Sequence, residues 1–308
     1  GQELPDGLPG CVGGVYAAVR EASQGTPLAH QMAGTLALRR VELQLPEDDG
    51  SPRAFPFSVS ALQGLDALDF GGPVCCFVGE NGSGKSTLIE ALAIATGLPT
   101  VGTVSASKDR SLEAQGRLAR CLKLVWNRRT HRGFFLRAED FFGFARRLVE
   151  MRVDFEEELQ EIDETYRERS ELARTLAKGP AHRSLGEMED RYGRDLDANS
   201  HGESFLKLFQ SRLVPGGLYL LDEPEAALSP QSQLAFLAMI KDSVDDGGQF
   251  LIATHSPILM AIPGATIYSF DGRPVEAMQF EDLEHVALMR EFLAAPERFL
   301  RHLWTEGD

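Results

Sequence analysis

The segment 79–87 carries the pattern that most constrains the fold of this chain. It reads Gly-Glu-Asn-Gly-Ser-Gly-Lys-Ser-Thr, a complete G-x-x-x-x-G-K-[ST] phosphate-binding loop, or P-loop. Its members are Gly79, Glu80, Asn81, Gly82, Ser83, Gly84, Lys85, Ser86 and Thr87. The glycines let the backbone curl so that successive N–H groups point inward at phosphate oxygens. The sequence therefore predicts a site for the phosphates of a nucleotide.

The residues on both sides of the loop support this interpretation. The run 74–78 before it is apolar and has the length of a strand, and the run 88–94 after it has helical character. A strand, loop and helix in this order separate a functional P-loop from a chance match. We expect Lys85 to reach the β- and γ-phosphates and Ser86 to offer its hydroxyl to Mg²⁺.

Composition narrows the classes of protein to consider. The chain of 308 residues has a formal net charge of −15, which argues against a surface that binds polyanions over its whole extent. No apolar run approaches the roughly 20 residues that span a bilayer, and the first residues lack the features of a secretion signal. We therefore expect no membrane partner and a cytoplasmic location. The cysteines Cys11, Cys75, Cys76 and Cys121 contain no C-x-x-C pair and are expected to be buried thiols.

Charge is distributed unevenly along the chain. Basic residues outnumber acidic ones over 105–152, and acidic residues dominate 154–171. One interpretation is that these blocks are solvated helix faces that pair with each other. The other is that the basic stretch, around Arg128, Arg129 and Arg132, binds nucleic acid.

The order of apolar runs along the chain predicts an α/β fold. An irregular arm is expected over 1–33, followed by a nucleotide-binding domain over 34–308. Strands are expected at 35–45, 55–59, 133–139, 217–222 and 249–254. Helices between the later strands favour a mostly parallel sheet with crossover connections.

A long segment, approximately 104–199, exceeds what a minimal nucleotide-binding core requires, and we predict that it is an inserted helical subdomain. Apolar residues at spacings of three, four or seven predict one helix over 141–177, ended by Lys178-Gly179-Pro180. Because this apolar stripe is too short for a long coiled-coil arm, the helix is expected to pack beside the core.

Polar side chains follow two of the predicted strands. Asp222 ends the apolar run 218–222 in the manner of a Walker B element, where it would hold Mg²⁺ directly or through water. Glu223 comes next, and its side chain points elsewhere, so it would orient or deprotonate an attacking water. His255 lies at the end of the following strand, where it could hydrogen-bond a γ-phosphate.

Together these motifs resemble those of the ATP-binding-cassette superfamily of ATPases. Ser200-His201-Gly202-Glu203-Ser204, about 20 residues before Asp222, is similar to the signature element Leu-Ser-Gly-Gly-Gln. Segment 222–225 resembles the extended Walker B element, 227–230 resembles the D-loop, and His255 resembles the switch histidine. The likeness covers roughly 35–300. More narrowly, the chain resembles stand-alone bacterial ATPases similar to RecF-like and chromosome-maintenance ATPase heads.

This resemblance implies ATP and Mg²⁺ as ligands and ATP hydrolysis as the reaction, with Glu223 and His255 as catalytic residues. It also implies a homodimer closed by ATP, in which residues of one copy complete the nucleotide site of the other. The residues that would cross the interface to the nucleotide are Ser200, Gly202 and Glu203. A role in DNA maintenance or defence rests on the same likeness. The alternative is a nucleotide-sensing clamp on DNA or a partner protein, in which hydrolysis is incidental.

Two positions depart from the pattern of the family. Ser229 stands where the D-loop usually carries Asp, which puts the usual dimer-crossing contact in doubt. The glutamine of the family's Q-loop is absent, and Glu139, at the end of the strand expected at 133–139, is the candidate for its place. A glutamate there could face Mg²⁺ or the attacking water, so Glu139 joins Ser86 and Asp222 as a candidate metal ligand.

Overall fold

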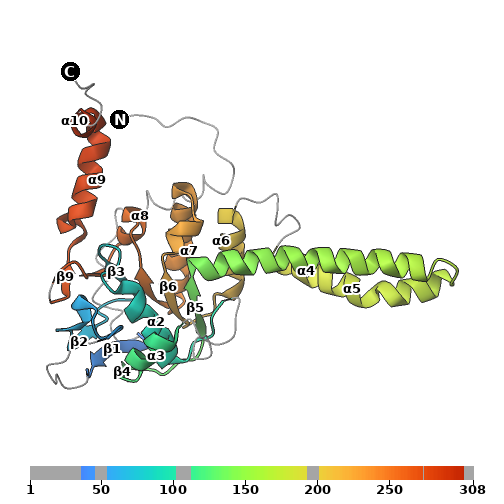
Figure 1. The fold of residues 1–308 in the computed structure, drawn as a ribbon, viewed down its shortest axis with the longest axis horizontal. Coiled ribbons are helices and arrows are strands. Elements are labelled where there is room, and N and C mark those ends of the chain that lie inside the picture. Colours follow the sequence, from blue (N-terminus) through green and yellow to red (C-terminus); the bar gives the residue numbers. More distant parts are fainter. Residues whose placement is uncertain (1–35, 46–53, 102–111, 193–200, 273, 302–308) are drawn as a thin grey trace.

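A mostly parallel sheet forms the centre of the molecule (Figure 1). The computed structural model describes residues 36–45, 54–101, 112–192, 201–272 and 274–301. The arm expected over 1–33 lies outside these residues. Among the described residues, the strand order in the 6-stranded sheet is β5-β6-β7-β3-β8-β9, and only β9 runs antiparallel to its neighbour. This sheet confirms the predicted α/β fold class.

The elements have the following bounds. The strands are β1 (Leu38–Leu43), β2 (Ala67–Asp69), β3 (Val74–Val78), β4 (Leu122–Trp126), β5 (Gly133–Arg137), β6 (Leu218–Asp222), β7 (Gln249–Ala253), β8 (Thr266–Ser269) and β9 (Glu276–Met278). The α-helices are α2 (Lys85–Thr96), α3 (Glu113–Ala119), α4 (Ala138–Thr165), α5 (Glu171–Tyr192), α6 (His201–Arg212), α7 (Pro230–Asp245), α8 (Pro257–Met260), α9 (Glu284–Ala294) and α10 (Pro296–Leu300). Short 3-10 helices occupy Ser60–Leu62 (η2), Pro224–Ala227 (η5) and Phe280–Asp282 (η6).

The apolar strands β3, β6 and β7 are buried on both faces, which explains why their sequences are continuous apolar runs. Successive side chains of a strand point to opposite faces. Thus Cys75 and Phe77 of β3 join a core cluster with α2, α3 and β1, whereas Cys76 and Val78 join a second cluster with α6 and α7. Helices on both faces leave the loops at the carboxyl ends of the strands open for chemistry.

A second, smaller sheet covers the α2 side of the core. Its strand order is β2-β1-β4, and both pairings are antiparallel. Strand β1 confirms the strand expected within 35–45. The strand expected at 55–59 is wrong: this segment forms turns in which the N–H of Phe57 donates to the carbonyl of Ala54 and that of Val59 to Pro56. Pro56 has no N–H to donate to a ladder, so the local turn bonds prevail.

The helical segment also differs from the prediction. Instead of one helix over 141–177, the antiparallel helices α4 and α5 form a hairpin that projects away from the sheets (Figure 1). Pro180 lies inside α5 and does not end it. The half-buried stripe Phe155, Leu159 and Ile162 lies on α4, and α5 folds back beside it after a polar turn at 166–170. Packing between the two helices outweighs the helix-breaking tendency of one proline.

The segment 104–199 is therefore not a purely helical insertion, because β4 belongs to the small sheet and β5 to the large one. Only the hairpin of α4 and α5 stands outside the core. Its charges pair across the two helices: Lys178 contacts Asp163, and Arg152 lies 3.6 Å from Glu189. Neither pair joins the basic block 105–152 to the acidic block 154–171, whereas Arg152 and Glu156, 3.9 Å apart, do. The interpretation that the two blocks pair with each other stays a prediction. Among the described residues, no helix combines the length and hydropathy needed to cross a bilayer.

Phe209 of α6 is the residue around which the second core cluster is built. Its ring lies 4.6 Å from that of Phe236 and 5.5 Å from that of Phe134, measured between centroids, and it also meets Tyr219 and Phe250. Edge-to-face contacts of this kind add to the burial of the rings. The cluster ties α6 and α7 to β5, β6 and β7.

Replacing Phe209 with Ala should lower the free energy of unfolding by about 3–5 kcal/mol, because it leaves a cavity among rings that cannot collapse. Denaturant titration followed by circular dichroism would measure the change. Leu176→Ala is the control, because Leu176 on α5 is 69% exposed and its truncation should cost less than about 0.5 kcal/mol. Similar losses for both variants would contradict this account of the core.

Candidate nucleotide-binding site

The P-loop connects β3 to α2, as the sequence predicts. The buried ammonium group of Lys85 donates to the carbonyl of Gly79 at 2.7 Å and to that of Glu80 at 3.0 Å, so the side chain curls over the loop. The buried hydroxyl of Ser83 has no hydrogen-bond partner among the described residues. A phosphate oxygen would supply the acceptor that this hydroxyl lacks, and α2 begins at the loop with its positive end. The loop therefore fits a nucleotide phosphate.

Gly84 shows why the loop needs glycine. Its φ of 108° lies in the left-handed region, and a Cβ there would overlap the side chain of Val59. Val59 comes from the turn that replaces the strand expected at 55–59. The turn thus supports the P-loop from outside the large sheet, a contact that links two segments separated in the sequence.

Ser86 and Asp222 lie together although they are far apart in the chain. The hydroxyl of Ser86 at the start of α2 donates to a carboxylate oxygen of Asp222 at the end of β6, at 2.9 Å. Hydroxyl and carboxylate oxygens are the hard ligands that Mg²⁺ prefers, so this pair fits the predicted metal site. Burial raises the pKa of Asp222 to about 7, and the neighbouring Glu90 and Glu223 act in the same direction. The hydrogen bond from Ser86 and the charge of Lys85 oppose this rise.

Glu223 follows Asp222 in an unusual backbone conformation. With φ of 50° and ψ of 47°, it is the one non-glycine residue with positive φ in the part of the chain that the structure describes. Its N–H donates to the carbonyl of Ala253 on the neighbouring strand β7, at 2.9 Å. This turn carries the Glu223 side chain out of the alternation of the strand. Backbone strain held by surrounding structure is typical of functional positions.

His255 lies beside Glu223, as expected for residues at the ends of adjacent strands. Its Nε2 is 3.6 Å from a Glu223 carboxylate oxygen, and this nitrogen is buried without a hydrogen-bond partner among the described residues. The backbone N–H of His255 donates to the carboxylate of Glu225. The unpartnered nitrogen leaves His255 able to contact a ligand.

The signature-like segment is described only in part, because Ser200 lies outside the described residues. Gly202 and Glu203 are in the first turn of α6. A Cβ on Gly202 would come 2.9 Å from the hydroxyl of Ser232, so α6 packs closely on the start of α7. Ser229 caps α7, with its hydroxyl accepting the N–H of Ser232 at 3.1 Å. Ser229, in the segment that resembles a D-loop, thus has a structural role as the cap of α7.

Glu139 is not at a strand end, since β5 ends at Arg137 and Glu139 is in the first turn of α4. Its side chain is 75% exposed and lies 3.2 Å from the guanidinium of Arg137. Arg137 in turn is paired in register with Asp222 across β5 and β6. Glu139 is therefore near the carboxyl edge that holds Ser86 and Asp222, and its role as a metal ligand stays a prediction.

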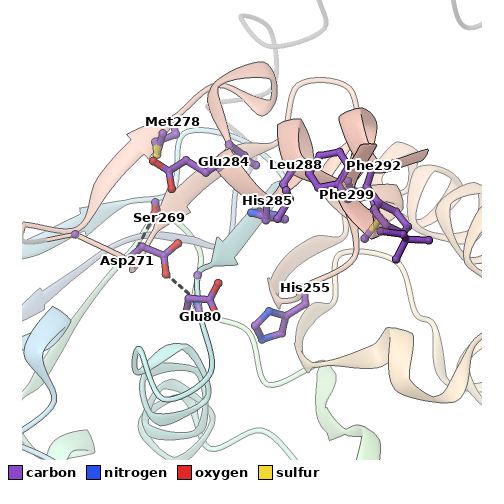
Figure 2. Close-up of a pocket in the computed structure, with 15 residues that line it drawn as sticks. Glu80, His255, Ser269, Asp271, Met278, Glu284, His285, Leu288, Phe292 and Phe299 are labelled. Atoms are coloured by element: carbon purple, nitrogen blue, oxygen red, sulfur yellow. Dashed lines mark hydrogen bonds between the residues drawn. The ribbon is translucent and has the colours of Figure 1, made fainter. Parts of the chain in front are cut away.

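A cleft of about 930 Å³ borders the P-loop on the side of β8. Figure 2 shows Glu80 and His255 on one side of it, and Leu288, Phe292 and Phe299 projecting from α9 and α10. These three side chains make part of the wall apolar, whereas Glu284 and His285 of α9 and Glu80 of the P-loop are polar. The cleft keeps the outer face of the P-loop accessible.

Several residues outside the sequence motifs also shape this site. The carboxylate of Asp271, after β8, accepts the N–H of Glu80 and so fixes the first turn of the P-loop. Gln233 joins the D-loop to the switch segment, since it donates to the carbonyl of Leu228 and accepts from the hydroxyl of Ser256. The position of Asp271 just after a strand was a usable signal. The role of Gln233 becomes visible only in three dimensions.

The strained turn at Glu223 generates a stability prediction. Asn tolerates the left-handed region better than Glu or Gln, so Glu223→Asn should be more stable than Glu223→Gln by about 0.5–1 kcal/mol. Both variants remove the carboxylate, so the comparison isolates the backbone. Thermal and denaturant unfolding of the two proteins without nucleotide would measure the difference. Equal stability would show that the turn is not strained.

Comparison with known proteins agrees with this geometry. Residues 56–118 match the family described as "AAA domain", and residues 135–261 match "AAA domain, putative AbiEii toxin, Type IV TA system". The Macrolide export ATP-binding/permease protein MacB of Rhodopseudomonas palustris (strain HaA2) is 28% identical over 245 residues, which are 78% of this chain and 34% of that protein. The chain thus spans about a third of MacB.

Another relative is similar over most of its length. The L-cystine transport system ATP-binding protein TcyN of Escherichia coli (strain K12) is 26% identical over 225 residues, covering 70% of this chain and 83% of TcyN. Among solved structures, a nucleotide-free ATP-binding cassette from an ABC transporter aligns with a TM-score of 0.42 and 16% identity, covering 85% of this chain and 97% of that one. The Smc head domain of Pyrococcus furiosus, bound to the C-terminal domain of ScpA, aligns with a TM-score of 0.39 and 14% identity, covering 83% and 99%.

The P-loop, Asp222 at the end of β6 and His255 after β7 meet at one edge of a parallel sheet. The matched families cover the segments that carry these motifs. The chain is therefore similar to P-loop ATPases of the ATP-binding-cassette type and to the two AAA-domain families.

Proposed function

We propose that this protein is an Mg²⁺-dependent ATPase whose two nucleotide sites close between two copies of the chain. The observation that carries the proposal is the meeting of Lys85, the Ser86–Asp222 pair and the Glu223–His255 pair at the carboxyl edge of the sheet. Lys85 would bind phosphate, and Ser86 and Asp222 would provide two oxygen ligands for one metal ion. Glu223 would act as a base beside the imidazole of His255. A set of this kind suits transfer of a phosphoryl group to water.

Each residue has a distinct role in this proposal. Lys85 and the loop N–H groups bind the β- and γ-phosphates, and Ser86 and Asp222 hold the metal. When bound, Mg²⁺ neutralises phosphate charge. Glu223 accepts a proton from the water whose oxygen attacks the γ-phosphorus, while the bond from that phosphorus to the ADP oxygen breaks. His255 orients the γ-phosphate through its unpartnered nitrogen.

The motif content of the chain supports the dimer. It contains one P-loop and one signature-like element, Ser200 to Ser204. In a symmetric pair, the α6 N-terminus of one copy would cover the nucleotide of the other, because a helix N-terminus favours an anion. ATP would then hold two copies together, and hydrolysis would release them.

We further propose that the ATP cycle serves defence or DNA maintenance. The description of the family matched by 135–261 names a toxin–antitoxin system, which supports a role in defence. The alternative is a clamp in which ATP closes the protein on DNA or a partner and hydrolysis is incidental. Capture of DNA or a partner that needs ATP and survives Glu223→Gln would favour the clamp.

Glu223→Gln should bind ATP with Mg²⁺ normally but hydrolyse it about 10²-fold or more slowly, because the amide cannot accept a proton. Light scattering should then show its mass doubling when ATP is added. Lys85→Ala is the control, and it should neither bind ATP nor change mass. If Glu223→Gln binds ATP and stays monomeric, the dimer proposal is wrong, although the nucleotide site stands.

A mixing experiment tests whether the site is shared between copies. Ser200→Arg places a bulky cation where the partner's γ-phosphate should dock, so this variant should bind ATP without hydrolysing it. Lys85→Ala should also be inactive, because its own P-loop cannot bind ATP although its Ser200 is intact. Mixing the two inactive proteins should restore part of the ATPase activity, because one composite site then has an intact Lys85 and an intact Ser200. Full activity of Ser200→Arg alone would refute completion of the site by a second copy.

A further inference from the structure

Arg137 is buried next to Asp222, one of the two proposed metal ligands. It is the last residue of β5 and is paired in register with Asp222 of β6. Its side chain is only 9% exposed. A buried guanidinium requires charged or polar partners, because its desolvation is otherwise too costly. The partners of Arg137 therefore indicate which parts of the protein its side chain holds together.

The guanidinium reaches three carboxylates on two helices. Nε and Nη2 donate to the two carboxylate oxygens of Asp140 at 2.8 and 3.0 Å, a two-pronged contact that Arg makes and Lys cannot. Nη1 lies 3.2 Å from an oxygen of Glu139 and 3.4 Å from an oxygen of Glu90. Asp140 and Glu139 belong to the first turn of α4, and Glu90 belongs to α2, the helix that follows the P-loop.

These contacts form a second link between α2 and the large sheet. Ser86 and Glu90 are four residues apart on α2 and so share one face of the helix. Ser86 bonds to Asp222 at the end of β6, and Glu90 contacts Arg137 at the end of the adjacent strand β5. Gln115 of α3 donates to the second oxygen of Glu90 at 2.8 Å and fixes it from the other side. Helix α2 is therefore held to the end of β6 through Ser86 and to the end of β5 through Glu90.

We infer that Arg137 is a positioning residue for the nucleotide reaction: it orients the carboxylate of Glu139 and holds the first turn of α4 against the P-loop helix. The inference rests on the proposed function. Glu139 is 75% exposed, so its side chain would otherwise sample several rotamers. The contact with Arg137 restrains the Glu139 carboxylate near the end of β5, which lies beside the end of β6 that carries Asp222. The same contacts join the base of the projecting hairpin to the helix that begins at Lys85.

Kinetics of single and double variants test whether Arg137 acts through Glu139. Arg137→Lys keeps the charge but loses the two-pronged contact, so kcat should fall on the order of 10-fold or more while the Kd for ATP changes less than about twofold. Glu139→Gln should cause a similar loss. The double variant should match Glu139→Gln alone, because the arginine has nothing left to orient. Losses that multiply in the double variant would show that Arg137 does not act through Glu139 and would overturn that part of the inference.

Arg152→Lys is the matched control. Arg152 lies on α4, the helix whose first turn Arg137 contacts, and it pairs with Glu156 and Glu189 on the hairpin, away from β5. Its conservative replacement should leave kcat unchanged. Circular dichroism and the Tm of each variant would show that the proteins are folded before rates are compared. A loss of kcat in Arg152→Lys as large as in Arg137→Lys would mean that the effect is general to the helix.

Hydrogen exchange with a non-hydrolysed ATP analogue and Mg²⁺ separates this inference from the proposed function. In the natural protein, the ligand should protect amides of α2 and of the first turn of α4. In Arg137→Lys, it should protect α2 alone. Absence of protection in α2 of the natural protein would defeat the nucleotide site itself. Protection of both segments in Arg137→Lys would leave the nucleotide site standing and overturn the role of Arg137.

Discussion

The burial of the parallel sheet on both faces is the constraint on which the rest of this structure depends. Strands β3, β6 and β7 are covered by α2 on one side and by α6 and α7 on the other, so polar groups cannot be placed along their length. Parallel strands end at the same edge, and there the chain becomes polar. Lys85, Asp222 and His255 meet at this edge although the sequence separates them widely. Their proximity follows from the strand order β6-β7-β3.

The edge carries a concentration of negative charge around one buried ammonium group. Asp222, Glu223, Glu225 and Asp271 all act to keep Lys85 charged, against a burial that lowers its pKa. Burial also raises the pKa of Glu225 and of Glu90. Such carboxylates favour a divalent cation beside them, because it offsets their mutual repulsion. Arg137 offsets part of the same charge from within the protein.

Much of the candidate site was predictable from sequence, because its residues follow apolar runs at short and characteristic distances. The P-loop, Asp222, Glu223 and His255 were found in this way, and the strands β3, β6 and β7 that carry them have the expected bounds within a few residues. The errors arose where local pattern and tertiary contact compete. Pro56 turns an apolar run away from strand pairing, and Pro180 is accommodated within α5 because that helix packs on α4. Strand β5 lies within the strand expected at 133–139, whereas β4 could not be separated from the helical segment by composition alone.

The sequence by itself determined the candidate groups for nucleotide binding, because a glycine-rich loop ending in Lys85 and Ser86, and an acid pair after a buried strand, are local patterns with local physical causes. The tertiary structure decided how these parts are held. The bond from Asp271 to the P-loop, the turn that supports Gly84 through Val59, and the network of Arg137, Glu90 and Asp140 all join segments that are distant in sequence. Strand order and register bring such residues together, and neither can be read from the periodicity of a single element. The sequence therefore names the candidate site residues, and packing between elements sets their positions.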